Sequence, residues 1–370
     1  MSRPRIIVIG LGAVGSATAY HLARAGAAVV GFDRWRPPHR WGATHGESRI
    51  TRATAWEGAQ YPPLMARAQR LWEELAQHTG ARYFDACGGL FVGHAQEYHV
   101  AGSLRSAREA GLAHEVLDGA ALARRYPGLV VPEGMVGFLD PAAGVLAPER
   151  IVEDQLAAAS ALGADLHFDV AVRGYSTRGA GVSVDTSAGR FTADALVLCA
   201  GGWMAALDGW AGPALNVERV TQHWFAESAG ASRRAELPVL LLSDGADHAT
   251  AVFPTRDGRI KVARHGSGRI GPIDALEREV QADDVAGAEG MLRAFLPHHA
   301  GAHLESRSCF YTRTPSGHFV IDRMPGAPNV VFASACNGYG FKFSAAVGEA
   351  LAALALGAEP PINIDAWRLD

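Results

Sequence analysis

Residues 5–33 read RIIVIGLGAVGSATAYHLARAGAAVVGFD, and this stretch decides the fold. Its first five residues form an apolar, β-branched run, which is typical of a buried parallel strand. Residues 13–25 have a helical composition, and residues 27–33 form a second apolar strand. Two such strands joined by a helix predict a βαβ unit, and βαβ units build parallel sheets.

Three glycines between the first strand and the helix match the pattern GxGxxG. Gly10 permits a tight turn, Gly12 lets the backbone approach a pyrophosphate, and Gly15 lets the helix pack closely on the strand. Asp33 ends the second strand, where an acidic side chain accepts hydrogen bonds from ribose hydroxyls. Asp33 also disfavours the 2′-phosphate of NADP, although the neighbouring Arg34 weakens that argument. The motif predicts a dinucleotide site and does not by itself separate FAD from NAD.

The rest of the chain does not continue the βαβ pattern. Helices are predicted over residues 64–74, 148–162 and 343–356, and short strands over 165–168, 182–186, 191–192, 195–202 and 330–333. Antiparallel strands are predicted over residues 239–242, 251–253 and 260–263, with a turn at 255–258. The fold class is therefore α/β plus antiparallel β, with a discontinuous nucleotide domain around an insertion. A nicotinamide dehydrogenase usually keeps its cofactor domain contiguous, so the discontinuous domain disfavours that class of enzyme.

Composition excludes several classes of protein. The 370 residues carry a formal net charge of -4 and no dense Lys/Arg run, so we expect no nucleic-acid partner. Four cysteines without a CxxC pair predict free thiols and a cytoplasmic location. No apolar run reaches the length of a membrane span, and the glycines at the N-terminus favour a strand and turn over a signal peptide.

Three further stretches carry a resemblance to a known family. They are GATHGESRITR at residues 42–52, SRSCFYTRTPSGHFVID at 306–322 and NGYGFKFS at 337–344. Together with the glycine motif, they resemble the monomeric sarcosine oxidase family of flavoenzymes, which includes N-methyltryptophan, pipecolate and fructosyl amino-acid oxidases. The resemblance implies a discontinuous Rossmann-type FAD-binding domain (residues 1–80, 145–215 and 325–370). It also implies an inserted catalytic domain built on an antiparallel sheet (residues 81–144 and 216–324).

The family resemblance also implies an activity. Its members oxidise the C–N bond of a small secondary amine, or of an N-methyl or cyclic amino acid, to an imine, and O2 is reduced to H2O2. We therefore expect FAD, a small-molecule amine substrate and O2 as partners, with no metal and no membrane association, in a monomeric enzyme. The alternatives are an amine dehydrogenase of the same fold that passes electrons to a carrier, an NAD(P)H-dependent flavin monooxygenase, and a flavin-binding protein without activity.

The cysteine at residue 309 lies where the family cysteine bonds covalently to the 8α carbon of the flavin. A thiolate is a suitable nucleophile for that position. The alternative is a small buried core residue, as most free cysteines are. We expect that simpler role for Cys87, Cys199 and Cys336.

Arg52 and Lys342 match family residues that hold the substrate carboxylate, a task that suits a guanidinium fork and an ammonium group. The alternatives are a surface ion pair for Arg52 and a solvated first-turn lysine for Lys342. Lys261 matches the lysine that activates oxygen beside the flavin, where a preorganised cation lowers the barrier to electron transfer. Its alternative is a strand lysine that faces solvent, because charged and apolar residues alternate there.

Further site residues follow from the resemblance alone. Arg49 matches an arginine beside the flavin ring, and His45, His265 and Tyr311 match active-site positions for hydrogen bonding and charge tuning. The implied cofactor contacts are Gly10, Gly12, Ala13, Val14, Gly15, Asp33, Arg34, Gly42, Thr44, His45, Ser48, Arg49, Val172, Gly201, Trp203, Cys309, Gly338, Gly340, Phe341 and Lys342.

The sequence departs from the family pattern at three positions. Thr44 and Tyr339 stand where histidines are common, and Ser316 stands where aspartate is usual. These departures do not affect the expected cofactor site, but they leave the identity of the substrate undetermined. Tyr339 could line the substrate pocket, which would suit a cyclic or bulkier amine.

Overall fold

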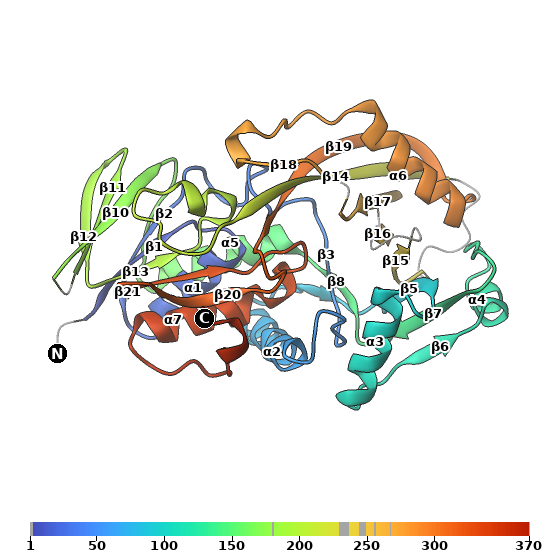
Figure 1. Cartoon of the computed structure of the whole chain (residues 1–370), viewed down its shortest axis with the longest axis horizontal. Coiled ribbons are helices and arrows are strands. Elements are labelled where there is room, and N and C mark those ends of the chain that lie inside the picture. Colours follow the sequence, from blue (N-terminus) through green and yellow to red (C-terminus); the bar gives the residue numbers. More distant parts are fainter. Residues whose placement is uncertain are drawn as a thin grey trace.

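The computed structural model of the chain describes residues 3–179, 181–228, 237–243, 249–254, 257–266 and 268–369. Thr255 and Arg256, which belong to the turn expected at 255–258, lie outside the described residues. Figure 1 shows two sheet systems side by side, crossed by the long strands β14 and β19. No helix among the described residues combines the length and the apolar character needed to cross a bilayer.

The first sheet contains the βαβ unit at its centre. Its six strands run in the order β20 (Val320–Met324), β21 (Ala327–Ser334), β13 (Ala195–Leu198), β1 (Arg5–Ile9), β2 (Ala28–Phe32) and β9 (Asp165–His167). The neighbours from β21 to β9 pair in parallel, and β20 is an antiparallel edge strand. Ile6, Ile7 and Val8 are fully buried in the central strand, as the apolar run predicts.

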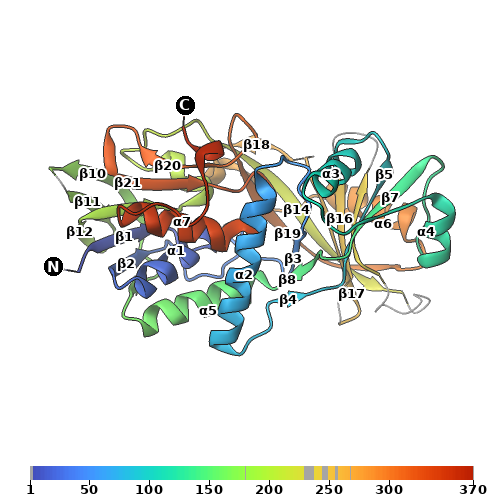
Figure 2. The ribbon, with the colours of Figure 1, turned by 90° about the horizontal axis from the view of Figure 1, so that it is seen from below.

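Helices cover one face of this sheet, as Figure 2 shows. They are α1 (Ala13–Arg24), α2 (Tyr61–Thr79), α5 (Pro148–Ala161) and α7 (Ser344–Ala355). The small side chains of α1 and α7 let these helices approach closely, since a Cβ on Gly348 would lie only 2.5 Å from that of Ala17. The opposite face packs against a small sheet of β10 (Val172–Arg178), β11 (Gly181–Thr186) and β12 (Gly189–Ala193).

The second large sheet holds nine strands within the described residues. Their order is β18 (Ile270–Gly271), β14 (Asn216–Glu227), β17 (Arg259–Arg264), β16 (Ala249–Pro254), β15 (Val239–Ser243), β5 (Gly89–His94), β7 (Met135–Asp140) and β6 (Glu115–Leu117), with β19 (Ala300–Arg313) also paired to β14. The helices α3 (Tyr98–Glu109), α4 (Gly119–Arg125) and α6 (Ala282–Phe295) pack around it. A short sheet of β3 (Arg49–Thr51), β8 (Gly144–Leu146) and β4 (Phe84–Asp85) completes the strands.

The strands and helices expected from the sequence are present, with ends that differ by a few residues. The largest difference is α2, which extends from Tyr61 to Thr79 rather than over 64–74. The strands expected near 239–263 pair antiparallel with one another, but β15 also pairs in parallel with β5. Sequence patterns missed the longest strands, β14 and β19. The proposed division into two domains stays a prediction.

Candidate active site

A cavity of about 890 Å³ extends from the glycine-rich turn to Arg52 and Lys342 and is lined by both large sheets. It begins at the carboxyl ends of the parallel strands, which is where α/β folds bind their ligands. The expected site residues that line it are Gly10, Gly12, Ala13, Val14, Asp33, Arg34, Gly42, Thr44, Ser48, Arg49, Arg52, Val172, Gly201, Trp203, Lys261, His265, Cys309, Tyr311, Gly338, Tyr339, Gly340, Phe341 and Lys342. Gly15 and His45 do not line it.

The glycine-rich turn is tight enough to require glycine. Gly10 has a φ of +84°, and a Cβ on Gly15 would lie 1.7 Å from the Gly10 carbonyl oxygen, so Gly15 acts through packing rather than contact with a ligand. Asp33 accepts a hydrogen bond of 2.8 Å from the backbone N–H of Leu11, which ties the end of β2 to this turn.

Other groups at this end of the cavity also suit a dinucleotide. The N-terminus of α1 faces the cavity through Gly12, Ala13 and Val14, so its positive dipole end would meet a pyrophosphate. The hydroxyls of Ser334 and Ser344 line the same cavity and are buried without a hydrogen-bond partner among the described residues. Buried hydroxyls are normally hydrogen-bonded, so these two are suited to a polar ligand.

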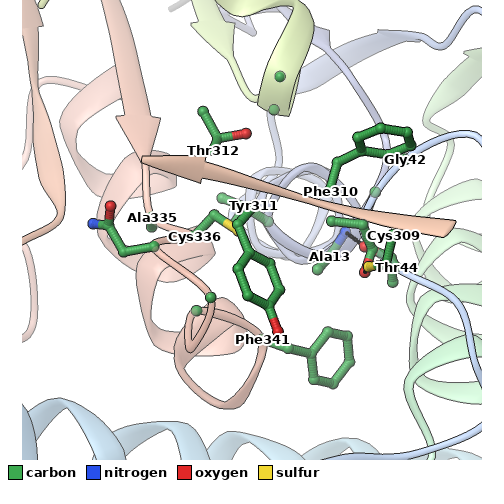
Figure 3. A pocket seen from close by; sticks show the side chains of 18 of the residues that line it. Ala13, Gly42, Thr44, Cys309, Phe310, Tyr311, Thr312, Ala335, Cys336 and Phe341 are labelled. Carbon is green, nitrogen blue, oxygen red and sulfur yellow. Dashed lines mark hydrogen bonds between the residues drawn. The ribbon is translucent and has the colours of Figure 1, made fainter. Parts of the chain in front are cut away.

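Cys309 lies on β19 where this strand passes the glycine-rich turn. Its Sγ is 3.8 Å from the carbonyl oxygen of Ala43 and 3.9 Å from the Arg49 guanidinium. Figure 3 shows Cys309 near Thr44 and Ala13, whose backbone N–H donates to the Thr44 hydroxyl at 3.3 Å. The thiol is therefore buried in the cavity wall beside the Arg49 guanidinium.

Lys261 is buried, so the solvent-facing alternative is wrong. The side chain is 2 % exposed, and its Nζ donates to the carbonyls of Gly46 at 2.7 Å and Ser48 at 3.0 Å. Both faces of β17 are covered by other parts of the protein, so the alternation of charged and apolar residues along this strand does not indicate a face exposed to solvent. Burial, reinforced by the Arg49 charge, lowers the pKa of Lys261.

His265 and Tyr311 form a hydrogen-bonded pair at the cavity wall, with 2.6 Å between the His265 Nδ1 and the Tyr311 hydroxyl. Burial lowers the pKa of His265 to about 3, so the imidazole is neutral. His45 instead lines a separate cavity of about 430 Å³, and neither of its ring nitrogens has a hydrogen-bond partner among the described residues. Burial, together with Arg49 and Lys261, lowers the pKa of His45 to about 3.

Arg52 and Lys342 meet at a buried carboxylate that sequence reasoning did not identify. The Arg52 guanidinium donates to Glu57 and to the carbonyl of Thr54, and the Lys342 Nζ lies 3.9 Å from the Glu57 Oε1. Arg52 and Lys342 are 1 % and 2 % exposed, so neither a surface ion pair nor a solvated lysine describes them. Burial favours the neutral form of Glu57, but the two cations outweigh it and lower the pKa of Glu57.

The four cations expected at the site, Arg49, Arg52, Lys261 and Lys342, form two separate pairs. Arg49 and Lys261 donate hydrogen bonds to carbonyls of the loop between β2 and β3, while Arg52 and Lys342 share Glu57. Glu57 lines the cavity, and no local sequence pattern identifies it, because its partner Lys342 lies far away in the chain. Among the remaining cysteines, Cys87 is exposed, so its expected place in the core is wrong.

Comparisons with known proteins agree with this geometry. The family described as FAD dependent oxidoreductase matches residues 5–354. The chain is 36% identical to a monomeric sarcosine oxidase of Streptomyces avermitilis, over 95% of this chain and 93% of that protein. It is 32% identical to an N-methyl-L-tryptophan oxidase of Yersinia pestis, over 98% of both chains.

Solved structures show the same fold. NikD, an unusual amino acid oxidase essential for nikkomycin biosynthesis, aligns with a TM-score of 0.86 and 21% identity, over 100% of this chain and 98% of that chain. The L-proline dehydrogenase of P. horikoshii aligns with a TM-score of 0.85 and 18% identity, over 99% and 97% of the two chains. With the family match and the relative of 36% identity, these findings show that the chain belongs to the FAD-dependent oxidoreductases, in the family that includes monomeric sarcosine oxidase.

Proposed function

We propose that the protein oxidises the C–N bond of a small secondary amine, or of an N-methyl or cyclic amino acid, to an imine and reduces O2 to H2O2. The observation that carries this proposal is the buried pair of Arg52 and Lys342, which share a single carboxylate in the wall of the cavity. Two buried cations beside one anion leave a net positive charge, which suits a substrate carboxylate. Sarcosine oxidase and N-methyl-L-tryptophan oxidase relatives support it.

The residues of the cavity fit FAD. The glycine-rich turn and the N-terminus of α1 would hold the pyrophosphate, Asp33 the ribose, and Cys309 the flavin through a covalent bond. When bound, FAD supplies the electron acceptor for a hydride from the carbon beside the amine nitrogen. The protein supplies binding, orientation and charge.

Each charged group then has a separate role. Arg52 and Lys342 bind the substrate carboxylate and so orient the reacting C–H bond, which makes the reaction effectively intramolecular. Arg49 lies beside Cys309, and Lys261 is held by the carbonyls of Gly46 and Ser48; the two side chains would stabilise the negative charge that develops when oxygen is reduced. His265 and Tyr311 hydrogen-bond to each other in the cavity wall and would offer hydrogen bonds at the site. His45 lines the neighbouring cavity, from which it would adjust the local charge.

Substrate-dependent release of H2O2 tests the proposed function. Purified protein should release one H2O2 for each amine oxidised when it is screened with sarcosine, N-methyl amino acids, pipecolate and proline. A coupled peroxidase assay measures this release. Turnover that requires an artificial electron carrier and yields no peroxide would instead identify a dehydrogenase, and consumption of NAD(P)H would identify a monooxygenase.

Removing the positive charge of Lys261 should separate the two half-reactions. We expect Lys261→Met to slow the oxygen half-reaction by about 10²-fold, because a buried charge that stabilises developing negative charge is lost. Anaerobic reduction by substrate should change far less. Stopped-flow absorbance of the flavin measures both rates. Equal losses in the two half-reactions would remove Lys261 from this role.

Acid precipitation tests whether Cys309 bonds covalently to the flavin. Acid precipitation of the wild-type protein should leave the yellow colour in the pellet, whereas Cys309→Ser should release it into the filtrate. The exposed Cys87 provides the matched control, because Cys87→Ser should behave like wild type. Wild-type flavin that passes the filter freely would contradict the covalent bond.

Glu57 should compete with the substrate carboxylate for Arg52 and Lys342. We expect Glu57→Gln to destabilise the ligand-free protein by about 3 kcal/mol or more, because two buried cations lose their anion. Saturating acetate should restore more stability to this variant than to wild type, since it supplies the missing charge. Thermal melting with and without acetate measures both effects.

Glu349→Gln is the matched control, because Glu349 pairs with Arg67 outside the cavity. It should lose less stability and should show no acetate rescue beyond that of wild type. An acetate response of Glu57→Gln equal to that of wild type would show that Glu57 does not compete for these cations.

A further inference from the structure

Three acceptors from the loop between β2 and β3 hold the ammonium group of Lys261. Its Nζ donates to the carbonyls of Gly46 at 2.7 Å and Ser48 at 3.0 Å, and to the hydroxyl of Ser48 at 3.2 Å. An ammonium group has three N–H donors, so these three bonds can satisfy all of them. The position of this charge in the cavity wall therefore depends on the shape of residues 46–48.

The residue at the centre of this loop has a backbone conformation that glutamate rarely adopts. The φ of Glu47 is +71°, and the Ser48 N–H donates to the Gly46 carbonyl oxygen at 2.8 Å. A hydrogen bond between residues i and i+2 around a positive central φ is the mark of the rare, strained form of the γ-turn. Strained turns persist only where the surrounding structure fixes them, and they concentrate at functional sites. This γ-turn carries the two carbonyls that bind Lys261, so whatever fixes Glu47 also fixes Lys261.

The Glu47 carboxylate anchors the γ-turn through a closed ring of four ion pairs. It pairs with Arg259 at 2.8 Å and with Arg307 at 3.2 Å. Glu305 bridges the same two arginines, at 3.1 Å from Arg259 and 3.0 Å from Arg307. Arg259 belongs to β17, whereas Glu305 and Arg307 belong to β19, so the ring ties the loop to two strands of the large sheet. A single ion pair of partly exposed side chains contributes little, but a network of several charges holds its members in place.

Two side chains from one face of β17 bind the γ-turn. Arg259 and Lys261 are two residues apart on this strand, so their side chains point to the same face of the sheet. Arg259 binds the side chain of Glu47, and Lys261 binds the backbone on either side of that residue. The backbone N–H of Glu47 also donates to the Glu149 Oε1 at 2.9 Å, at the start of α5. Release of the Glu47 carboxylate from the ring would therefore let the turn move, and Lys261 with it.

We propose that Glu47 is a positioning residue for the reduction of oxygen. Glu47 does not line the cavity, so it would act through the γ-turn, which sets the place of the Lys261 charge. The inference rests on the proposed function, in which Lys261 stabilises the negative charge that develops on oxygen. Loss of the Glu47 charge should therefore affect the oxygen half-reaction and spare the binding of the substrate carboxylate, because the two cations proposed for that task pair with Glu57.

Amine labelling of the holoenzyme measures how firmly Lys261 is held and does not require turnover. Lys261 and Lys342 are the only lysines of the chain, so an acetylating reagent such as N-hydroxysuccinimide acetate reports on these two side chains. In Glu47→Gln, Lys261 should be acetylated about 5-fold faster than in wild type, as expected when an ion-pair network is weakened. Lys342 is the internal control and should keep its rate. Mass spectrometry of peptides measures both rates.

Stopped-flow kinetics measure the consequence for the two half-reactions. Glu47→Gln should slow flavin re-oxidation by oxygen about 10-fold, less than Lys261→Met, because the charge is displaced rather than removed. The anaerobic rate of flavin reduction and its dependence on amine concentration should stay within about twofold of wild type.

Two further variants make the comparison specific. Glu305→Gln removes one negative charge from the same ring, but at a residue of β19 outside the γ-turn, so it should change both measurements far less. Glu47→Gly removes the carboxylate and places at residue 47 an amino acid that adopts a positive φ freely. It should match Glu47→Gln, and it replaces that variant if Glu47→Gln does not fold.

Faster labelling of Lys261 together with a slower oxygen half-reaction, in the Glu47 variants and not in Glu305→Gln, supports the proposal. Unchanged labelling, or an unchanged oxygen half-reaction, overturns it. Equal effects of Glu47→Gln and Glu305→Gln also overturn it, because the charge of the ring rather than the shape of the turn would then be responsible. If Lys261→Met itself leaves the oxygen half-reaction unchanged, the proposed role of Lys261 fails, and labelling alone decides whether Glu47 positions this side chain.

Discussion

Two cations and one carboxylate, all buried, constrain the whole active site. Arg52, Glu57 and Lys342 lie together with little access to water, and such charges are tolerated only when they are paired and hydrogen-bonded. The surrounding backbone meets this need, since the carbonyls of Thr54 and Tyr339 accept hydrogen bonds from Arg52 and Lys342. The loop after β3 and the turn before α7 are therefore fixed relative to each other by charge.

The same constraint links the cofactor half of the fold to its substrate half. Lys342 comes from the short turn that leads into α7, on the parallel sheet, while Arg52 and Glu57 follow β3 of the small sheet. The long strand β19 makes a second connection, because it is paired with β14 and carries Cys309 and Tyr311 into the cavity. A ligand that spans the cavity would contact both halves at once.

The two lysines of the cavity, Lys261 and Lys342, have different partners and different proposed roles. Lys261 is held by carbonyls of the loop at 46–48, whereas Lys342 pairs with Glu57. Burial lowers the pKa of both lysines, but only Lys342 has a carboxylate within ion-pair distance among the described residues. A cation without a nearby anion is available for charge that develops during reaction, and a paired cation can exchange its partner for a substrate carboxylate.

The sequence by itself determined the βαβ core and the dinucleotide turn, because apolar periodicity and glycine spacing are local properties of residues 5–33. Most of the site residues that its resemblance to a known family named do line the cavity. Only the tertiary structure decided that Lys261 is buried and that Glu57 joins Arg52 and Lys342. The physical reason is that burial and charge pairing arise between segments far apart in the chain, and local patterns carry no record of them.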